Sequence, residues 1–197
     1  MAALPAEGVL ATASLVALLV AGLLTLYAVY RLDGRPRVGS VLRRRWVLGV
    51  PWGTVLVVAG IVAVYLFVQG ALGRLRDPVV IAFRAWSYDY PLGMLTSAFA
   101  HSGLGHVTNN LLGTVVFAPI AEYAWSHYPT RRGSESFADL RSNPYARIGG
   151  FVLGVLLVGL ATSFFIPGAS VGFSGVVFAF AGLAVVRYPL TAVAALL

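Results

Sequence analysis

Four long stretches of this chain carry no charged residue, and they restrict its possible folds more than any other feature. Residues 8–30 hold no charge over 23 positions. A helix of that length can cross a hydrocarbon core of about 30 Å. Similar stretches follow at 46–73, 148–168 and 171–186. Together with a hydrophobic content of 59%, they predict an all-α, polytopic membrane helix bundle, that is, a multi-pass integral membrane protein.

The arginines lie between these stretches and predict the orientation. Segment 31–45 carries six arginines against one acid, and 127–147 carries four. Both are expected on the cytoplasmic side, because basic loops stay there. The aromatic segment 74–100 is then external and lies in the membrane interface. This distribution accounts for the net charge of +7 without a nucleic-acid partner. No eukaryotic targeting signal is visible, so we expect a prokaryotic plasma membrane.

The stretch HSGLGHVTNN at 101–110 places polar side chains at the start of an apolar helix expected from about Gly103 to about Ser126. Imidazole and carboxamide groups are costly in lipid unless the protein satisfies them. His106 and Asn110 are four residues apart, so on a helix they share a face. His101 is expected just before the helix, folded back towards it, with Ser102 as a capping residue.

A second polar site is predicted at GASVGFSGVVFAF, residues 168–180. Ser174 stands in a Gly-x-Ser-Gly pattern at the external start of a helix, where Gly172 and Gly175 permit close backbone approach. A helix N-terminus offers unpaired N–H groups and a positive dipole end, as an oxyanion hole requires. Taken alone, the pattern is equally consistent with small residues packed between helices.

Considered together, the two sites favour acyl-transfer chemistry at the external face. Both lie at the external ends of inward-running helices, and so at the same depth. One offers a hydroxyl, and the other offers an imidazole and a carboxamide as donors. No metal is expected, because the chain has no cysteine and His101 and His106 are only two nitrogen ligands without a nearby carboxylate.

Read as H-x4-H-x3-N and followed by GFSGVVFAFAG one helical hairpin later, these motifs resemble those of the rhomboid intramembrane serine proteases, over about residues 46–197. The resemblance implies a six-helix core whose Ser–His dyad cleaves transmembrane protein substrates without metal or cofactor. Ser174 would then be the nucleophile. His106, Asn110 and the Ser174 N–H would form the oxyanion site.

The same resemblance assigns supporting roles. His101 would hold the loop and the start of its helix. Phe178 would stand where an aromatic ring packs against the catalytic histidine. Glu122, near the cytoplasmic end of the histidine helix, fits the family as well.

The chain departs from the family pattern in two respects. Residues 1–45 would form an extra N-terminal transmembrane helix and a cytoplasmic arginine-rich loop, and 46–197 would form a partial rhomboid-like core. The general base is also missing, because all three histidines precede Ser174, whereas the dyad histidine of the family lies two helices after the serine. His127, the third histidine, is expected at the cytoplasmic interface.

The expected explanation is truncation. The final residues, PLTAVAALL, look like the opening of another span. The last core helices, including the one with the dyad histidine, are then missing, and this fragment is expected to be inactive alone.

Two other functions compete with the protease. A catalytically dead relative that binds transmembrane clients would lack the histidine downstream. A channel or transporter would need polar side chains along a pathway, and Glu122 appears isolated near an interface. Retention of Ser174 together with His106 and Asn110 favours the protease.

Overall fold

A computed structural model describes residues 36–195 of the chain, which divides into two units, Met1–Arg44 and Arg45–Leu197. The described part of the first unit belongs to helix α2 (Pro36–Arg45), which ends in three consecutive arginines. The span expected at 8–30 lies outside the described residues.

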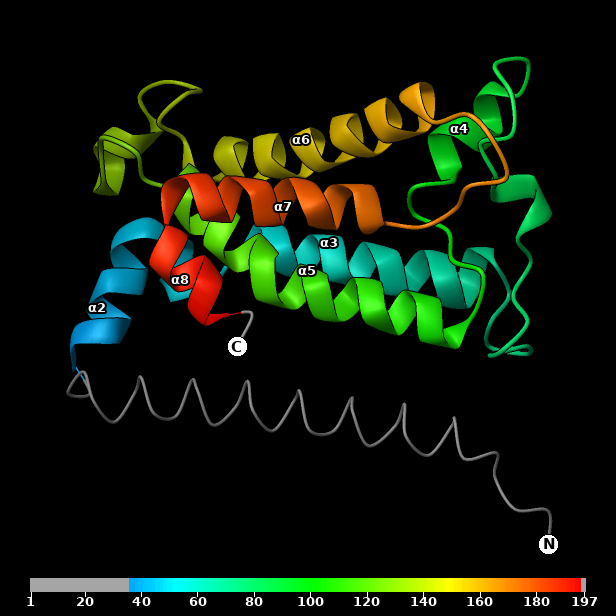
Figure 1. Cartoon of the computed structure of the whole chain (residues 1–197). Helices are drawn as coiled ribbons and strands as arrows, with labels where there is room; N and C mark the ends of the chain where they lie inside the picture. Colours follow the sequence, from blue (N-terminus) through cyan, green and yellow to red (C-terminus); the bar gives the residue numbers. More distant parts are fainter. Residues whose placement is uncertain (1–35, 196–197) are drawn as a thin grey trace, which may run out of the picture. The chain divides into compact units, whose positions relative to one another are not determined.

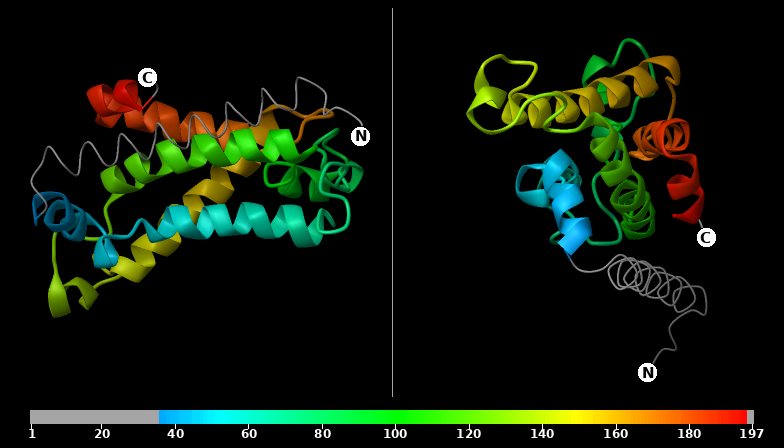
Figure 2. Two further views of the ribbon diagram at one scale, coloured as in Figure 1. Left: turned by 90° about the horizontal axis from the view of Figure 1, so that it is seen from below. Right: turned by 90° about the vertical axis from the view of Figure 1, so that its left-hand side faces the viewer.

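The second unit is a bundle of four main helices. They are α3 (Trp52–Ala63), extended by the π-helical turn η2 (Val64–Val68), and α5 (Leu104–Trp125), α6 (Pro144–Phe165) and α7 (Ser174–Arg187). α3 packs against α5, α5 against α7, α7 against α6, and α6 against α3 (Figures 1 and 2). Within residues 36–195 there is no β-strand, only one isolated bridge. The expected all-α class is confirmed.

The helix in the uncharged run 46–73 is shorter than predicted. The uncharged residues 46–73 open with a 3₁₀ turn, η1 (Val47–Gly49), in which Leu48 and Gly49 have φ of 57° and 77°. Pro51 then precedes the helix, and Gly70, with φ of 69°, follows its end. Positive φ values and a proline interrupt helical hydrogen bonding, so the helical part runs only from Trp52 to Val68.

The other main helices lie close to their predicted ranges. α5 differs by one residue at each end from the range expected. α6 begins four residues before the uncharged run at 148, because the Asn143 side chain caps it by accepting from the N–H groups of Tyr145 and Ala146. It ends at Phe165, just before Pro167 and Gly168.

Shorter helices occupy the connections. The segment predicted to lie in the interface contains η3 (Ile81–Phe83) and α4 (Pro91–Thr96), and α4 packs on α6. The connection between α5 and α6 contains η4 (Gly133–Phe137). After α7, the chain forms α8 (Pro189–Ala194), where the opening of a further span was expected.

Apolar residues both fill the core and cover much of the surface. The core contains Ile61, Val107, Phe151, Phe173, Val176 and Phe180. Outside it, large apolar side chains remain exposed, among them Phe67 at 69%, Phe165 at 78% and Val186 at 78%. Among the described helices, α6 alone has both the length and the hydropathy to cross a membrane; Trp52–Val68 and α7 are apolar but shorter.

Candidate active site

The N-termini of α5 and α7 lie at the same end of the bundle (Figure 1), so the two predicted polar sites come together. α5 begins at Leu104 with Gly103 as its N-cap residue and has no side-chain cap. The prediction that Ser102 caps the helix is therefore wrong. The Ser102 hydroxyl instead lies 2.9 Å from Nδ1 of His106, which leaves Nε2 of this ring free for another partner.

His106 and Asn110 share a helix face, as their spacing predicts, and both approach the loop that leads to Ser174. A methyl group placed on Gly172 would lie 2.4 Å from His106 Nε2 and 3.4 Å from Asn110 Nδ2. Gly172 has φ of 123°, a conformation that favours glycine. The absence of a side chain at Gly172 thus lets the backbone lie directly on the two polar groups.

Asn110 is buried, and its amide nitrogen has no hydrogen-bond partner among the described residues. A buried amide donor without a partner costs about 1–3 kcal/mol, so such a group usually marks a place where water or a ligand binds. Asn109, its neighbour, is exposed.

Ser174 is the first residue of α7, and its side chain is exposed. Its hydroxyl makes no hydrogen bond to any described residue, and neither do the backbone N–H groups of Ser174 and Gly175. The buried ring of Phe173 anchors the preceding residue in the core. A free hydroxyl beside unpaired N–H groups at a helix N-terminus is the arrangement that an attacking serine and an oxyanion need.

Close contacts on both sides of Ser174 hold this turn in place. Gly172 donates its N–H to the carbonyl of Ser97 over 2.8 Å. The Ser97 hydroxyl pairs with that of Ser163 on α6 at 2.7 Å. A methyl group on Gly175 would lie 2.5 Å from Cγ2 of Thr162, so α7 starts against α6 at a distance that only glycine allows.

His101 precedes α5 and folds back onto it, as predicted. It is completely buried, and its ring centroid lies 5.2 Å from that of His106 and 6.4 Å from that of Tyr65. The side-chain amide of Gln69 holds its backbone, accepting from the His101 N–H and donating to the His101 carbonyl, each over 2.8 Å. The sequence interpretation missed Gln69, although a single amide in the apolar run VYLFVQG could have indicated it.

Burial lowers the pKa of His101 to about 4, and the nearby His106 ring adds to the shift. The backbone of Phe99 opposes it only weakly, since neither ring nitrogen of His101 makes a hydrogen bond of normal geometry with a described residue. His101 is therefore neutral at physiological pH in the folded protein. Its place in the bundle is that of a packing residue behind His106.

We expect His101 to make the protein acid-sensitive. The unfolded chain takes up a proton on this residue near pH 6.5, whereas the folded chain does so only near pH 4. Above pH 6.5 the neutral His101 does not lower the free energy of unfolding. As the pH drops to 4, the free energy of unfolding falls by about 3 kcal/mol because of this residue. Unfolding in detergent, followed from pH 7.5 to 4 for the protein and for His101→Phe, measures this slope. Equal slopes in the two proteins would contradict the prediction.

His127 lies at the other end of α5, two residues after the helix ends. It is completely buried, accepts from the Val47 N–H at Nδ1 over 3.0 Å, and contacts Glu122 through Nε2 at 2.7 Å. Because Nδ1 accepts, the proton of the neutral ring sits on Nε2 and is donated to the carboxylate. His127 is thus already engaged, and at the opposite end of the helix from His106.

Phe178 and Glu122, the other two residues that the resemblance singled out, both lie on the main helices. Phe178 projects from α7 with 75% of its surface exposed. Contrary to expectation, Glu122 does not stand alone: it is completely buried and accepts hydrogen bonds from the start of α3, so the prediction that it is isolated is wrong. Within residues 36–195, no group of three or more histidine, cysteine, aspartate or glutamate side chains could hold a metal ion.

Comparisons with models of known protein families, with characterised proteins and with solved structures find no match to this chain.

Proposed function

We propose that this chain is a rhomboid-like, multi-pass membrane protein that acts as an intramembrane serine endopeptidase on transmembrane protein substrates. The observation that carries the proposal is the close approach of Gly172, two residues before Ser174, to α5: a methyl group on Gly172 would lie 2.4 Å from His106 Nε2 and 3.4 Å from Asn110 Nδ2. It supports the proposal that the free hydroxyl of Ser174 and two polar side chains of α5 belong to one site.

In the proposed reaction, the Ser174 hydroxyl attacks the scissile carbonyl while a base removes its proton. The carbonyl oxygen becomes negatively charged as the tetrahedral intermediate forms. This oxygen would accept hydrogen bonds from Nε2–H of His106, from the Asn110 amide and from the Ser174 N–H. Removal of one such donor lowers the rate about 10²–10³-fold. The Ser102 hydroxyl supports this role if it donates to Nδ1, because the proton of His106 then sits on Nε2.

In this proposal, the base is none of the three histidines of this sequence. His101 is buried behind His106, and His127 is bonded to Glu122 at the far end of α5. His106 is assigned to the oxyanion. The 197 residues by themselves are therefore expected not to cleave a substrate, and cleavage by them would make His106 the base.

Membrane embedding is the other part of the proposal. It is supported by the hydropathy of α6 and by the exposed apolar side chains on α3, α6 and α7. The alternating arginine-rich segments support an external active site and a cytoplasmic end at His127.

A fluorophosphonate probe tests the proposal on protein expressed from its complete gene and held in detergent. We expect labelling of Ser174, its loss in Ser174→Ala, and normal labelling in Ser170→Ala, which changes an exposed serine of the same loop. Asn110→Ala should slow labelling about 100-fold, whereas Asn109→Ala should not slow it.

Folded protein that is not labelled at Ser174 would refute the peptidase. Co-purification of transmembrane clients with such unlabelled protein would favour the client-binding alternative. Equal effects of the two asparagine variants would remove Asn110 from the oxyanion site.

A further inference from the structure

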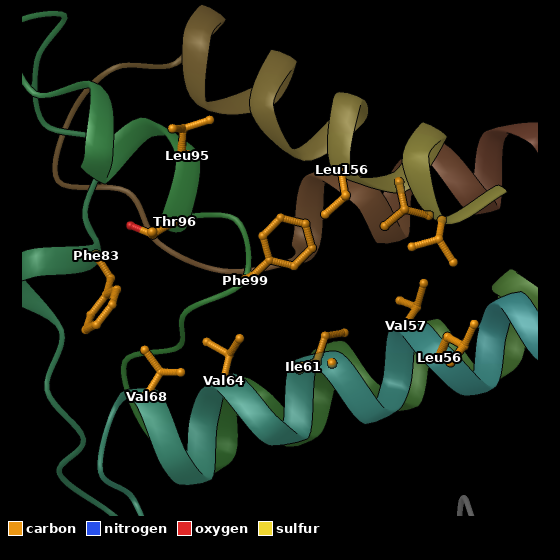
Figure 3. A pocket seen from close by; sticks show the side chains of 13 residues that line it. Leu56, Val57, Ile61, Val64, Val68, Phe83, Leu95, Thr96, Phe99 and Leu156 are labelled. Carbon is orange, nitrogen blue, oxygen red and sulfur yellow. The ribbon is translucent and has the colours of Figure 1, made fainter. Parts of the chain in front are cut away.

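A groove of about 330 Å³ opens between α3, α4 and α6 (Figure 3). Its lining is apolar except for Thr96, whose hydroxyl already donates to the Leu92 carbonyl over 2.9 Å. Side chains from the three helices and from the 3₁₀ turn η3 point into it. They include Leu56, Ile61, Val68, Phe83, Leu95 and Leu156.

The groove opens to the side of the bundle and is continuous with its apolar surface. Of the lining residues, Leu56 is 51% exposed, Val68 58%, Leu95 55% and Leu156 46%. A groove without a free polar group cannot satisfy water or a polar ligand. Its occupant must therefore be apolar over its whole buried length.

We propose that this groove binds one acyl chain of an anionic phospholipid. One turn of an α-helix, about 5.4 Å long and at least 10 Å across, occupies about 420 Å³, so the groove could take in a helical segment by one face only. An extended acyl chain fits the groove. One methylene occupies about 30 Å³, close to the volume of one molecule of liquid water, so about eleven methylenes fill the space. Each buried methylene favours binding by the hydrophobic effect.

Arg84 provides the reason for an anionic headgroup. It directly follows Phe83, which lines the end of the groove formed by η3. Its Nε is buried, has no hydrogen-bond partner among the described residues, and the guanidinium makes no ion pair with them. A buried guanidinium N–H needs an acceptor, and a lipid phosphate is an acceptor of matching charge and geometry.

This inference rests on the membrane embedding proposed above but not on peptide hydrolysis. Labelling of Ser174 and binding of lipid are read from different residues. Loss of one would leave the other measurable.

Gly60 offers a variant that fills the groove without disturbing the fold. It lines the groove on α3, and a methyl group placed on it meets nothing within 4 Å. Leucine also favours a helix more than glycine does, so Gly60→Leu should fold. Gly182→Leu is the matched control, since Gly182 on α7 also has open space and lies outside the groove.

The experiment uses the protein in phosphatidylcholine vesicles that contain a phosphatidylglycerol with a diazirine in one acyl chain. After irradiation, mass spectrometry should locate cross-links at Leu56, Phe83, Leu95 and Leu156. Gly60→Leu should lower this labelling about tenfold because it occupies the space of several methylenes, and Gly182→Leu should leave it unchanged. Arg84→Gln should reduce about tenfold the preference for this probe over a diazirine phosphatidylcholine, whereas Arg74→Gln should not.

Cross-links spread evenly over other exposed apolar residues, such as Leu153 and Phe178, would overturn the inference. So would groove labelling that Gly60→Leu does not lower. Equal labelling by the two lipids in the unmodified protein would refute the headgroup role of Arg84. If a photoreactive transmembrane peptide labelled the groove in a Gly60-dependent way and the lipids did not, the occupant would be a peptide and the acyl-chain assignment would be wrong.

Discussion

Replacement of Glu122 by alanine is expected to lower the free energy of unfolding by about 3–5 kcal/mol, the cost of removing one partner from a buried charged network. The carboxylate is completely buried on α5 and accepts hydrogen bonds from the N–H groups of Gly53 and Thr54, from the Thr54 hydroxyl and from His127 Nε2. Each is 2.7 Å long. Alanine would leave these donors buried without an acceptor.

Thermal or denaturant unfolding in detergent measures this effect. Glu135→Ala is the control, because Glu135 is exposed in the connection between α5 and α6 and should change stability by at most about 0.5 kcal/mol. Glu122→Gln tests whether the charge matters, since its amide nitrogen cannot accept from the N–H groups of α3. Equal stability of Glu122→Ala and Glu135→Ala would contradict the anchoring role of Glu122.

Replacement of Gly172 by alanine is expected to slow labelling of Ser174 about 100-fold or more. The new methyl group would lie 2.4 Å from His106 Nε2, far inside contact distance, so the loop or the ring must move. A displacement of about 1 Å at a reacting group can cost about 10² in rate. The φ of 123° adds backbone strain of about 1–3 kcal/mol.

Gly168→Ala is the matched control, because Gly168 lies in the same loop and a methyl group there meets nothing within 4 Å. Labelling rates with a fluorophosphonate and the unfolding transition should be measured for both variants. A Gly172→Ala protein that labels as fast as Gly168→Ala would remove the Gly172 contact from the proposed site. Loss of folding in Gly172→Ala would transfer the test to Asn110→Ala, in which the loop is unchanged.

These two predictions concern opposite ends of α5. The Glu122 variant tests what stabilises the fold, and the Gly172 variant tests the reactivity of Ser174. His106 and Asn110 face the loop before Ser174 at one end, while Glu122 and His127 join the start of α3 at the other. A helix bonded at one end and packed along its length by Val107, Phe117 and Ala121 can hold its other end in a constant position. Such rigidity is what an oxyanion site requires.

Local features were predictable from the sequence because a few neighbouring residues determine them. The four-residue spacing of His106 and Asn110 puts them on one face of any helix. The predicted ranges of α5 and α6 are close to the observed ones, and Pro167 and Gly168 follow the end of α6. The cap was misassigned to Ser102 because its hydroxyl pairs instead with Nδ1 of His106, four residues later, and Gly103 becomes the N-cap residue.

Only the tertiary structure decided which distant groups meet. Glu122 and Gly53 are 69 residues apart, and Gln69 and His101 are 32 apart, so no local pattern joins them. The same holds for the burial of His127 and for the contact of Gly172 with Asn110. The sequence by itself determined the helices and the polar residues at their ends. Helix packing decided which of those residues are paired, which are buried and which remain free, because a buried polar group takes its partner from whichever helix face lies against it.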